Sequence, residues 1–131
     1  MSKLSFESKK RIKKELDRLL IEIQEGEIIV EGIKDKRALN NIGLFNVHTL
    51  HGNFRRIVEI LKEKDVKKVF ILTDFDRRGN ELAEELKGEL TAQSIDFDLE
   101  KRKRLGTILN IRFWENTDKK LDQFLEKLKE V

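Results

Sequence analysis

The sequence contains no cysteine, no proline and no tyrosine, and each absence limits what the chain can do. Without cysteine there are no disulfides, no thiol nucleophiles and no cysteine-ligated zinc sites. Without tyrosine a covalent tyrosyl intermediate is impossible, and without proline few kinks are fixed along the chain. Long apolar runs are missing too, because the longest, residues 28–30 and 69–72, fall far short of the ~20 residues that a bilayer requires. We expect a soluble protein.

The 131 residues are enough for one domain and too few for two. Residues 1–14 are highly charged and lack the apolar segment of a secretory signal, so we expect a cytoplasmic protein. Charged residues make up 40% of the chain, and abundant Lys and Glu with a single Met are typical of thermophile proteins. The net charge is only +3, so any nucleic-acid binding requires a local basic patch.

Short apolar runs alternate with amphipathic segments along the chain. The runs predict four strands, at residues 27–30, 45–50, 68–72 and 95–99. The amphipathic segments predict helices at residues 4–24, 35–42, 54–64, 80–90 and 118–129. This alternation predicts an α/β fold with a mostly parallel, doubly wound sheet. We expect a core at residues 27–99, an amphipathic helix within 1–26 packed on it, and an extension at 100–131 ending in a helix.

Acidic residues follow two of the predicted strands. Glu31 follows the first strand, and Asp74 and Asp76 follow the third. The carboxyl ends of parallel strands share one edge, where open α/β sheets place their ligands. An Asp-x-Asp there directs two carboxylates to one side, an arrangement that suits Mg²⁺. Two structural alternatives stay open: residues 76–79 fit a type I turn, and an acid at position 31 suits the start of the next helix. Asp35 is interpreted as a helix N-cap.

The two motifs, Val30-Glu31-Gly32 and residues 73–79 (TDFDRRG), resemble those of the Toprim domain. This domain occurs in topoisomerases, bacterial primases, OLD-type nucleases, recombination mediator proteins and ribosomal-RNA maturation nucleases. The resemblance spans residues 27–99 and is strongest to small, stand-alone archaeal Toprim proteins. It implies a Rossmann-like fold in which Glu31 is the general acid or base. It also implies a site for Mg²⁺, with Mn²⁺ as a substitute, at Asp74 and Asp76 together with Glu31.

Several basic residues follow the same strand ends. We expect phosphate or nucleic-acid contacts from Lys34, Arg55, Arg56, Arg77 and Arg78, with solvated turns as the alternative.

Four other features have more than one interpretation. Residues 51–53 (His-Gly-Asn), before a helix, predict a second phosphate site. The basic run at 101–104 is either a solvated face or a contact for a nucleic-acid backbone. Phe113 and Trp114 are interpreted as core anchors rather than as base-stacking surfaces, and His48 as a packed strand residue.

The leading hypothesis is a Mg²⁺-dependent protein acting on nucleic-acid phosphodiesters, specifically an RNA-processing nuclease with RNA favoured over DNA. The absence of tyrosine excludes topoisomerase activity, and no Walker-type glycine loop supports nucleotide hydrolysis. The alternative is a non-catalytic, metal-dependent nucleic-acid-binding module. The sequence does not identify the substrate or the oligomeric state.

Overall fold

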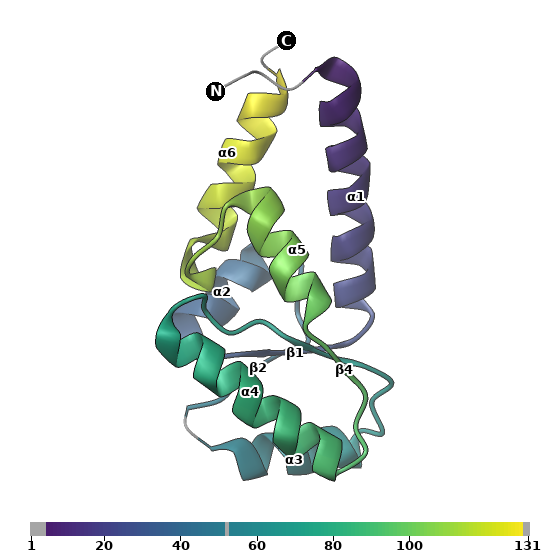
Figure 1. Cartoon of the computed structure of the whole chain (residues 1–131), viewed down its shortest axis with the longest axis vertical. Helices are drawn as coiled ribbons and strands as arrows, with labels where there is room; N and C mark the ends of the chain where they lie inside the picture. Colours follow the sequence, from purple (N-terminus) through teal and green to yellow (C-terminus); the bar gives the residue numbers. More distant parts are fainter. Residues whose placement is uncertain (1–4, 52, 130–131) are drawn as a thin grey trace.

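Four parallel strands form one sheet with helices on both faces (Figure 1). This computed structural model describes residues 5–51 and 53–129. The strands are β1 (Glu27–Val30), β2 (Val47–Thr49), β3 (Val69–Ile71) and β4 (Phe97–Asp98). They lie in the order β2-β1-β3-β4, with every pairing parallel. The predicted parallel, doubly wound α/β fold is therefore confirmed.

The helices divide into two layers. One face of the sheet carries α1 (Phe6–Gln24), α2 (Ile33–Asn41), α5 (Glu100–Leu109) and α6 (Thr117–Lys129), and the other carries α3 (Phe54–Glu63) and α4 (Arg77–Ala92). A short 3₁₀ turn, η1 (Trp114–Asn116), connects α5 to α6. Among the described ranges no helix is both long and apolar enough to cross a membrane.

Strand β1 is buried on both faces, as its unbroken apolar run predicts. Successive side chains of a strand point to opposite faces, so Ile28 and Val30 join the cluster beneath α1, α2 and α5. Ile29 joins the second cluster, beneath α3 and α4. The central strand therefore links the two hydrophobic cores.

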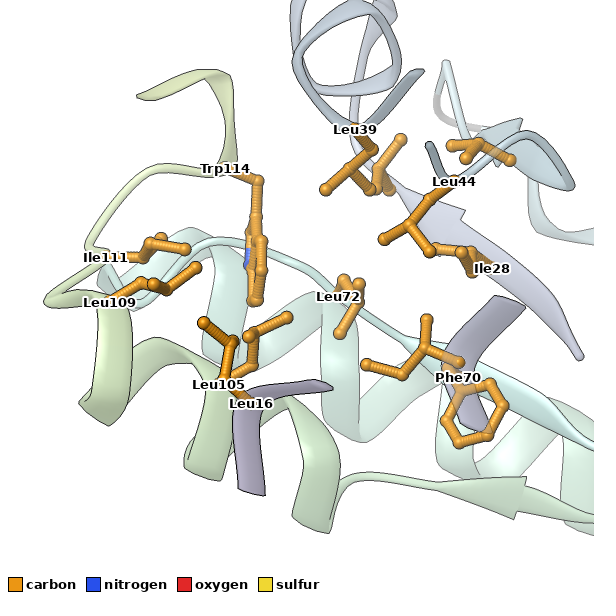
Figure 2. Packing of buried hydrophobic residues seen from close by; sticks show 13 residues of the cluster. Leu16, Ile28, Leu39, Leu44, Phe70, Leu72, Leu105, Leu109, Ile111 and Trp114 are labelled. Carbon is orange, nitrogen blue, oxygen red and sulfur yellow. The ribbon is translucent and has the colours of Figure 1, made fainter. Parts of the chain in front are cut away.

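Trp114 anchors the larger core from a position far along the chain. Its side chain is fully buried, and Figure 2 shows the indole pointing into the cluster near Leu105, Leu109 and Ile111. The prediction that Trp114 is a core anchor is confirmed. Because α5 and η1 both contribute to this cluster, residues after the predicted core are part of the same hydrophobic unit.

Two helices begin earlier than predicted, and their caps explain why. Asp76 is the N-cap of α4, since its Oδ1 accepts a hydrogen bond from the Gly79 amide at 2.7 Å. Arg77 and Arg78 therefore lie inside the first turn of α4 and not before it. Helix α2 begins at Ile33, so the prediction that Asp35 is its N-cap is wrong.

Other boundaries also differ from prediction. Helix α5 occupies part of the segment that had no assignment, and β4 is only two residues long. The predicted start of the first helix, residue 4, lies outside the described residues, as do residues 1–3 and 130–131 of the predicted terminal segments.

The order of the strands creates a switch point between β1 and β3. The chain leaves β1 toward β2 on one side, then crosses to β3 and continues to β4 on the other side. In open α/β sheets, ligands bind where adjacent connections diverge in this way, and we use 'crevice' here for that place at the carboxyl ends of β1 and β3. Glu31 follows β1 and Asp74 follows β3, so the predicted acidic residues lie at this crevice.

Helix α4 provides a matched test of how closely its first turn approaches the loop after β3. A Cβ at position 79 would lie 1.9 Å from the carbonyl oxygen of Asp74, whereas a Cβ at Gly88 would meet nothing within 4 Å. We expect Gly79→Ala to destabilise the fold by about 3 kcal/mol, because backbone must move to admit the methyl group. Gly88→Ala should stabilise it by up to about 1 kcal/mol through helix propensity. Urea unfolding of both variants tests this, and equal effects would contradict the close approach.

Candidate functional site

The loops that follow β1 and β3 meet through a direct hydrogen bond. The backbone amide of Asp74 donates to Oε2 of Glu31 at 2.6 Å, although the two residues are 43 positions apart. The pairing of Ile29 with Ile71 in the adjacent strands sets this distance. The structure therefore brings together the predicted proton-transfer residue and the first predicted metal ligand.

Each of the three predicted carboxylates uses one oxygen to accept a backbone hydrogen bond. Glu31 accepts from Asp74, Asp74 accepts through Oδ1 from the Trp114 amide at 2.9 Å, and Asp76 accepts through Oδ1 from Gly79. The second oxygen of each carboxylate has no hydrogen bond to another described residue. None of these oxygens is among the buried polar atoms that lack a partner, so they are open to solvent. Each of the three carboxylates is thus oriented by one hydrogen bond and keeps one oxygen without a hydrogen bond to the described residues.

Asp35 adds a fourth carboxylate to the neighbourhood. It is 7% exposed, and its Oδ2 accepts a hydrogen bond from the Gly32 amide at 3.2 Å, from the first turn of α2. Burial raises the pKa of Asp35, and the negative charges of Glu31 and Glu115 raise it further. This residue stabilises the turn after β1 and increases the negative potential beside it.

The charges around Asp74 are poorly compensated. Burial, with smaller contributions from Asp35, Glu31 and Asp76, raises the pKa of Asp74 from 3.8 to about 7, while the hydrogen bond from Trp114 opposes the rise. Without a cation this carboxyl is therefore close to half protonated at neutral pH. A bound divalent cation would offset the free-energy cost of ionising this carboxyl.

The carboxylates do not by themselves enclose an ion. Within residues 5–51 and 53–129, no three acidic or imidazole side chains are grouped closely enough to hold a metal. Glu31 and Asp76 each use one oxygen to accept from a backbone amide, so one oxygen of each is left for a cation. The donors available are single carboxylate oxygens, which fits Mg²⁺, since this ion retains several waters and binds through few carboxylates.

Arg102 of α5 holds the loop that carries Asp74, a role that the sequence did not predict. Its guanidinium donates to the carbonyl oxygens of Thr73 at 2.8 Å and Asp74 at 2.6 Å, and to Oδ1 of Asn80 at 2.7 Å. It also lies over the Phe75 ring at 4.4 Å from the centroid. Burial lowers the pKa of Arg102, and the nearby carboxylates oppose that change. Because its donors point to carbonyl oxygens, Arg102 fixes the loop without pairing with the aspartates.

The rest of the basic run also has an explanation within the fold. Lys101 lies 3.5 Å from Glu22, and Arg104 pairs with Glu15, so α5 is tied to α1 by two ion pairs. The alternative of a fully solvated face for residues 101–104 is therefore wrong, whereas a nucleic-acid contact by this run stays a prediction.

Trp114 completes the support of the same loop. Its indole Nε1 donates to the carbonyl oxygen of Thr73 at 2.8 Å, and its amide donates to Asp74, as described above. Beside it, the Phe75 amide donates to the Arg112 carbonyl oxygen at 2.9 Å. Phe113, between these two anchoring residues, is only half-buried and belongs to neither core cluster, so its prediction as a core anchor is wrong.

The predicted phosphate-binding residues lie at the same edge of the sheet. All are exposed and occupy the first turns of the helices after β1, β2 and β3: Lys34 in α2, Arg55 and Arg56 in α3, and Arg77 and Arg78 in α4. Arg77 also pairs with Glu81 at 3.1 Å.

The two histidines lie in different places, His48 within β2 and His51 after it. His48 is confirmed as a packed residue, with its Nε2 at 3.2 Å from Glu27 Oε2. The second predicted phosphate site includes Gly52, which lies outside the described residues. Next to it, Asn53 is the N-cap of α3 and accepts from the Arg56 amide at 3.2 Å.

The raised pKa of Asp74 predicts how the metal-free protein responds to pH. A carboxyl whose pKa is raised by folding contributes stability that is present below its ordinary value of 3.8 and is lost as pH rises to about 7. Asp74→Asn removes this loss, because the amide stays neutral. In EDTA, the melting temperature of the variant should exceed that of the wild type by about 5 °C at pH 8 and by little at pH 4. A difference that does not grow with pH would contradict the assignment.

Comparisons with known proteins place these features in a family. The profile of the Toprim domain matches residues 27–107. A UPF0292 protein of Thermococcus gammatolerans is 39% identical over 85 residues, covering 64% of this chain and 63% of the relative. A UPF0292 protein of Methanocaldococcus jannaschii is 37% identical over 82 residues, covering 61% of this chain and 64% of the relative. The chain thus spans slightly less than two thirds of the length of these archaeal relatives.

A solved structure supports the same relationship. A protein from Aquifex aeolicus superimposes with a TM-score of 0.68 at 30% identity, covering 76% of this chain and 95% of that chain. The family match runs from the start of β1 into α5, so it contains Glu31, Asp74, Asp76 and Arg102. With the parallel sheet and the acidic crevice, these comparisons show that the chain belongs to the Toprim domain family.

Proposed function

We propose that this protein is a Mg²⁺-dependent nuclease that hydrolyses phosphodiester bonds in RNA. Membership of the Toprim family supports a metal-dependent function on nucleic acids. The observation that carries the finer proposal is the junction between the Asp74 amide and Glu31, because it fixes a proton-transfer group beside a metal-binding group. The preference for RNA depends on the motif resemblance to ribosomal-RNA maturation nucleases.

The aspartates supply the metal-binding part of the site. Asp74 Oδ2 and Asp76 Oδ2 are the oxygens not used by backbone amides, and they would hold Mg²⁺ or Mn²⁺ together with water and a phosphate oxygen. When bound, the cation neutralises charge on the phosphate and polarises the bond to be cleaved. The hydrogen bonds from Trp114 and Gly79 keep both carboxylates oriented before the cation arrives.

Glu31 supplies the proton transfer. Its Oε2 is fixed by the Asp74 amide, so Oε1 is the atom that accepts a proton from the attacking water or returns one to the leaving oxygen. Glu31 is half-buried at the crevice, which keeps the free oxygen in contact with solvent and substrate. One carboxylate is thus oriented for acid–base work while its neighbours bind the cation.

The basic residues supply the contacts to the rest of the nucleic-acid backbone. Lys34, Arg56 and Arg78 extend from the first turns of three helices whose amino ends face the carboxyl edge of the sheet. Positive side chains and the partial positive charge of helix N-termini both favour phosphate. We propose that the nucleic-acid backbone runs along this edge, past the acidic crevice.

Two variants separate proton transfer from metal binding. Glu31→Gln keeps an oxygen that accepts from Asp74 but loses basicity, so cleavage of labelled RNA should fall by about 10²-fold or more while Mn²⁺ binding persists. Asp76→Ser keeps an N-cap for α4 but removes the charge, so Mn²⁺ binding and cleavage should fall together without a large loss of stability.

Calorimetric titration with Mn²⁺ and a cleavage assay, run on both variants, measure these effects. Wild-type rates in Glu31→Gln would refute the acid–base role. A wild-type protein that binds RNA and Mn²⁺ but never cleaves would favour the alternative, a metal-dependent binding module.

The path of the backbone gives a separate prediction. Arg77→Ala with Arg78→Ala removes two cations beside the crevice, so RNA affinity should fall and the slope of log K against log salt should decrease by about 1–2. Lys67→Ala with Lys87→Ala removes the same charge from exposed positions away from this edge and is the control. Fluorescence anisotropy at about 50 to 300 mM salt measures the RNA affinity of both double variants. Equal losses would mean that net charge alone governs binding.

A further inference from the structure

Phe113 stands out because it is an aromatic residue that is only half-buried. It belongs to neither hydrophobic cluster of the described residues, although its neighbour Trp114 is fully buried. Its backbone is extended, with φ −123° and ψ 126°, which turns its side chain away from that of Trp114. The indole of Trp114 points into the core (Figure 2), whereas Phe113 packs against neither core cluster of the described residues.

The position of Phe113 relative to the crevice is fixed on both sides. The carbonyl oxygen before it, on Arg112, accepts from the Phe75 amide at 2.9 Å. The amide after it, on Trp114, donates to Asp74 Oδ1 at 2.9 Å. Phe113 is therefore held directly alongside the Asp74–Phe75 peptide, next to the predicted metal ligand.

A cation accompanies the ring. The guanidinium of Arg112 lies over Phe113 at 5.5 Å from the ring centroid, and Arg112 is itself exposed. An aromatic face beside an arginine is the combination on which unpaired bases stack, with the positive charge available to the adjoining phosphate. A base that is still paired and stacked in a duplex does not present its face in this way.

We propose that Phe113, with Arg112, is a stacking surface for an unpaired base next to the phosphate at the metal site. This inference depends on the proposed function, because it assigns the substrate of the same site to the single-stranded class. The stacking contact is sequence-tolerant, since every base has an aromatic face. It would favour single-stranded over double-stranded substrates without selecting a base sequence.

The experiment compares two single-stranded ligands that differ only in their bases. One is a labelled eight-nucleotide oligoadenylate, and the other is an abasic ribose-phosphate oligomer of the same length. Binding is measured by anisotropy with Mg²⁺ in a Glu31→Gln background, in which cleavage is expected to be slow. We expect the Glu31→Gln protein, which is the parent in this comparison, to bind oligoadenylate about 10-fold more tightly than the abasic oligomer. Adding Phe113→Leu should remove most of this preference and leave the affinity for the abasic oligomer unchanged.

Matched variants identify the aromatic face as the cause. Phe113→Trp should keep the preference, because a larger aromatic surface also stacks. Phe45→Leu is the control, since Phe45 is 67% exposed but precedes β2 and lies at the opposite edge of the sheet. A fully paired duplex of the same length should bind the parent and Phe113→Leu equally.

The outcomes that overturn the inference are distinct from those that overturn the function. If Phe113→Leu keeps the preference, or weakens both single-stranded ligands equally, stacking at this residue is refuted even though the wild type still cleaves RNA. If the wild type cleaves RNA but has no preference for oligoadenylate, the inference is likewise refuted. If the wild type binds neither ligand and cleaves nothing, the proposed function fails together with it.

Discussion

The candidate site depends on the hydrogen bonds that the backbone of the loop after β3 makes once the chain leaves the sheet. The carbonyl oxygens of Thr73 and Asp74 accept hydrogen bonds from Arg102, and Thr73 also accepts from the indole of Trp114. The Asp74 amide donates to Glu31. Buried backbone groups without partners are costly, so these bonds determine where the loop lies. They link β1, β3, α5 and η1, and the position of the aspartates follows from all four.

The negative charges at the crevice lower the free energy of unfolding of the metal-free protein. Burial, and to a smaller extent the charges of Asp35, Glu31 and Asp76, raise the pKa of Asp74 to about 7, so ionising this carboxyl costs free energy in the folded protein. Arg102 is close, but its hydrogen bonds are made to carbonyl and amide oxygens, so the carboxylate oxygens stay available. Functional sites commonly keep such unfavourable arrangements, which the surrounding fold must stabilise. Here two buried clusters, on opposite faces of the sheet, provide that stability.

The sequence predicted what depends on local pattern and on topology. Apolar runs gave the four strands, and the rule that ligands gather at the carboxyl edge identified Glu31 and Asp74. Arg102 and Trp114 were missed as parts of the site, because their contacts with Asp74 span 28 and 40 residues and have no periodicity. The start of α4 was misplaced because the signal of Asp76 as an N-cap is also that of a turn. Phe113 was wrongly predicted to anchor the core because an aromatic residue beside Trp114 resembles a core residue in composition, whereas it is only half-buried.

The late position of Trp114 has a consequence for the order of events during synthesis. All four strands are complete once Asp98 has left the ribosome, yet the amide that orients Asp74 belongs to a residue made later. Until Arg102 and Trp114 have been made, the loop after β3 lacks these hydrogen-bond partners, and one face of the sheet lacks part of its core. Contacts between distant residues form late for the same entropic reason in a free chain. The loop that carries Asp74 can therefore reach its final position only after the residues of α5 and η1 have been made.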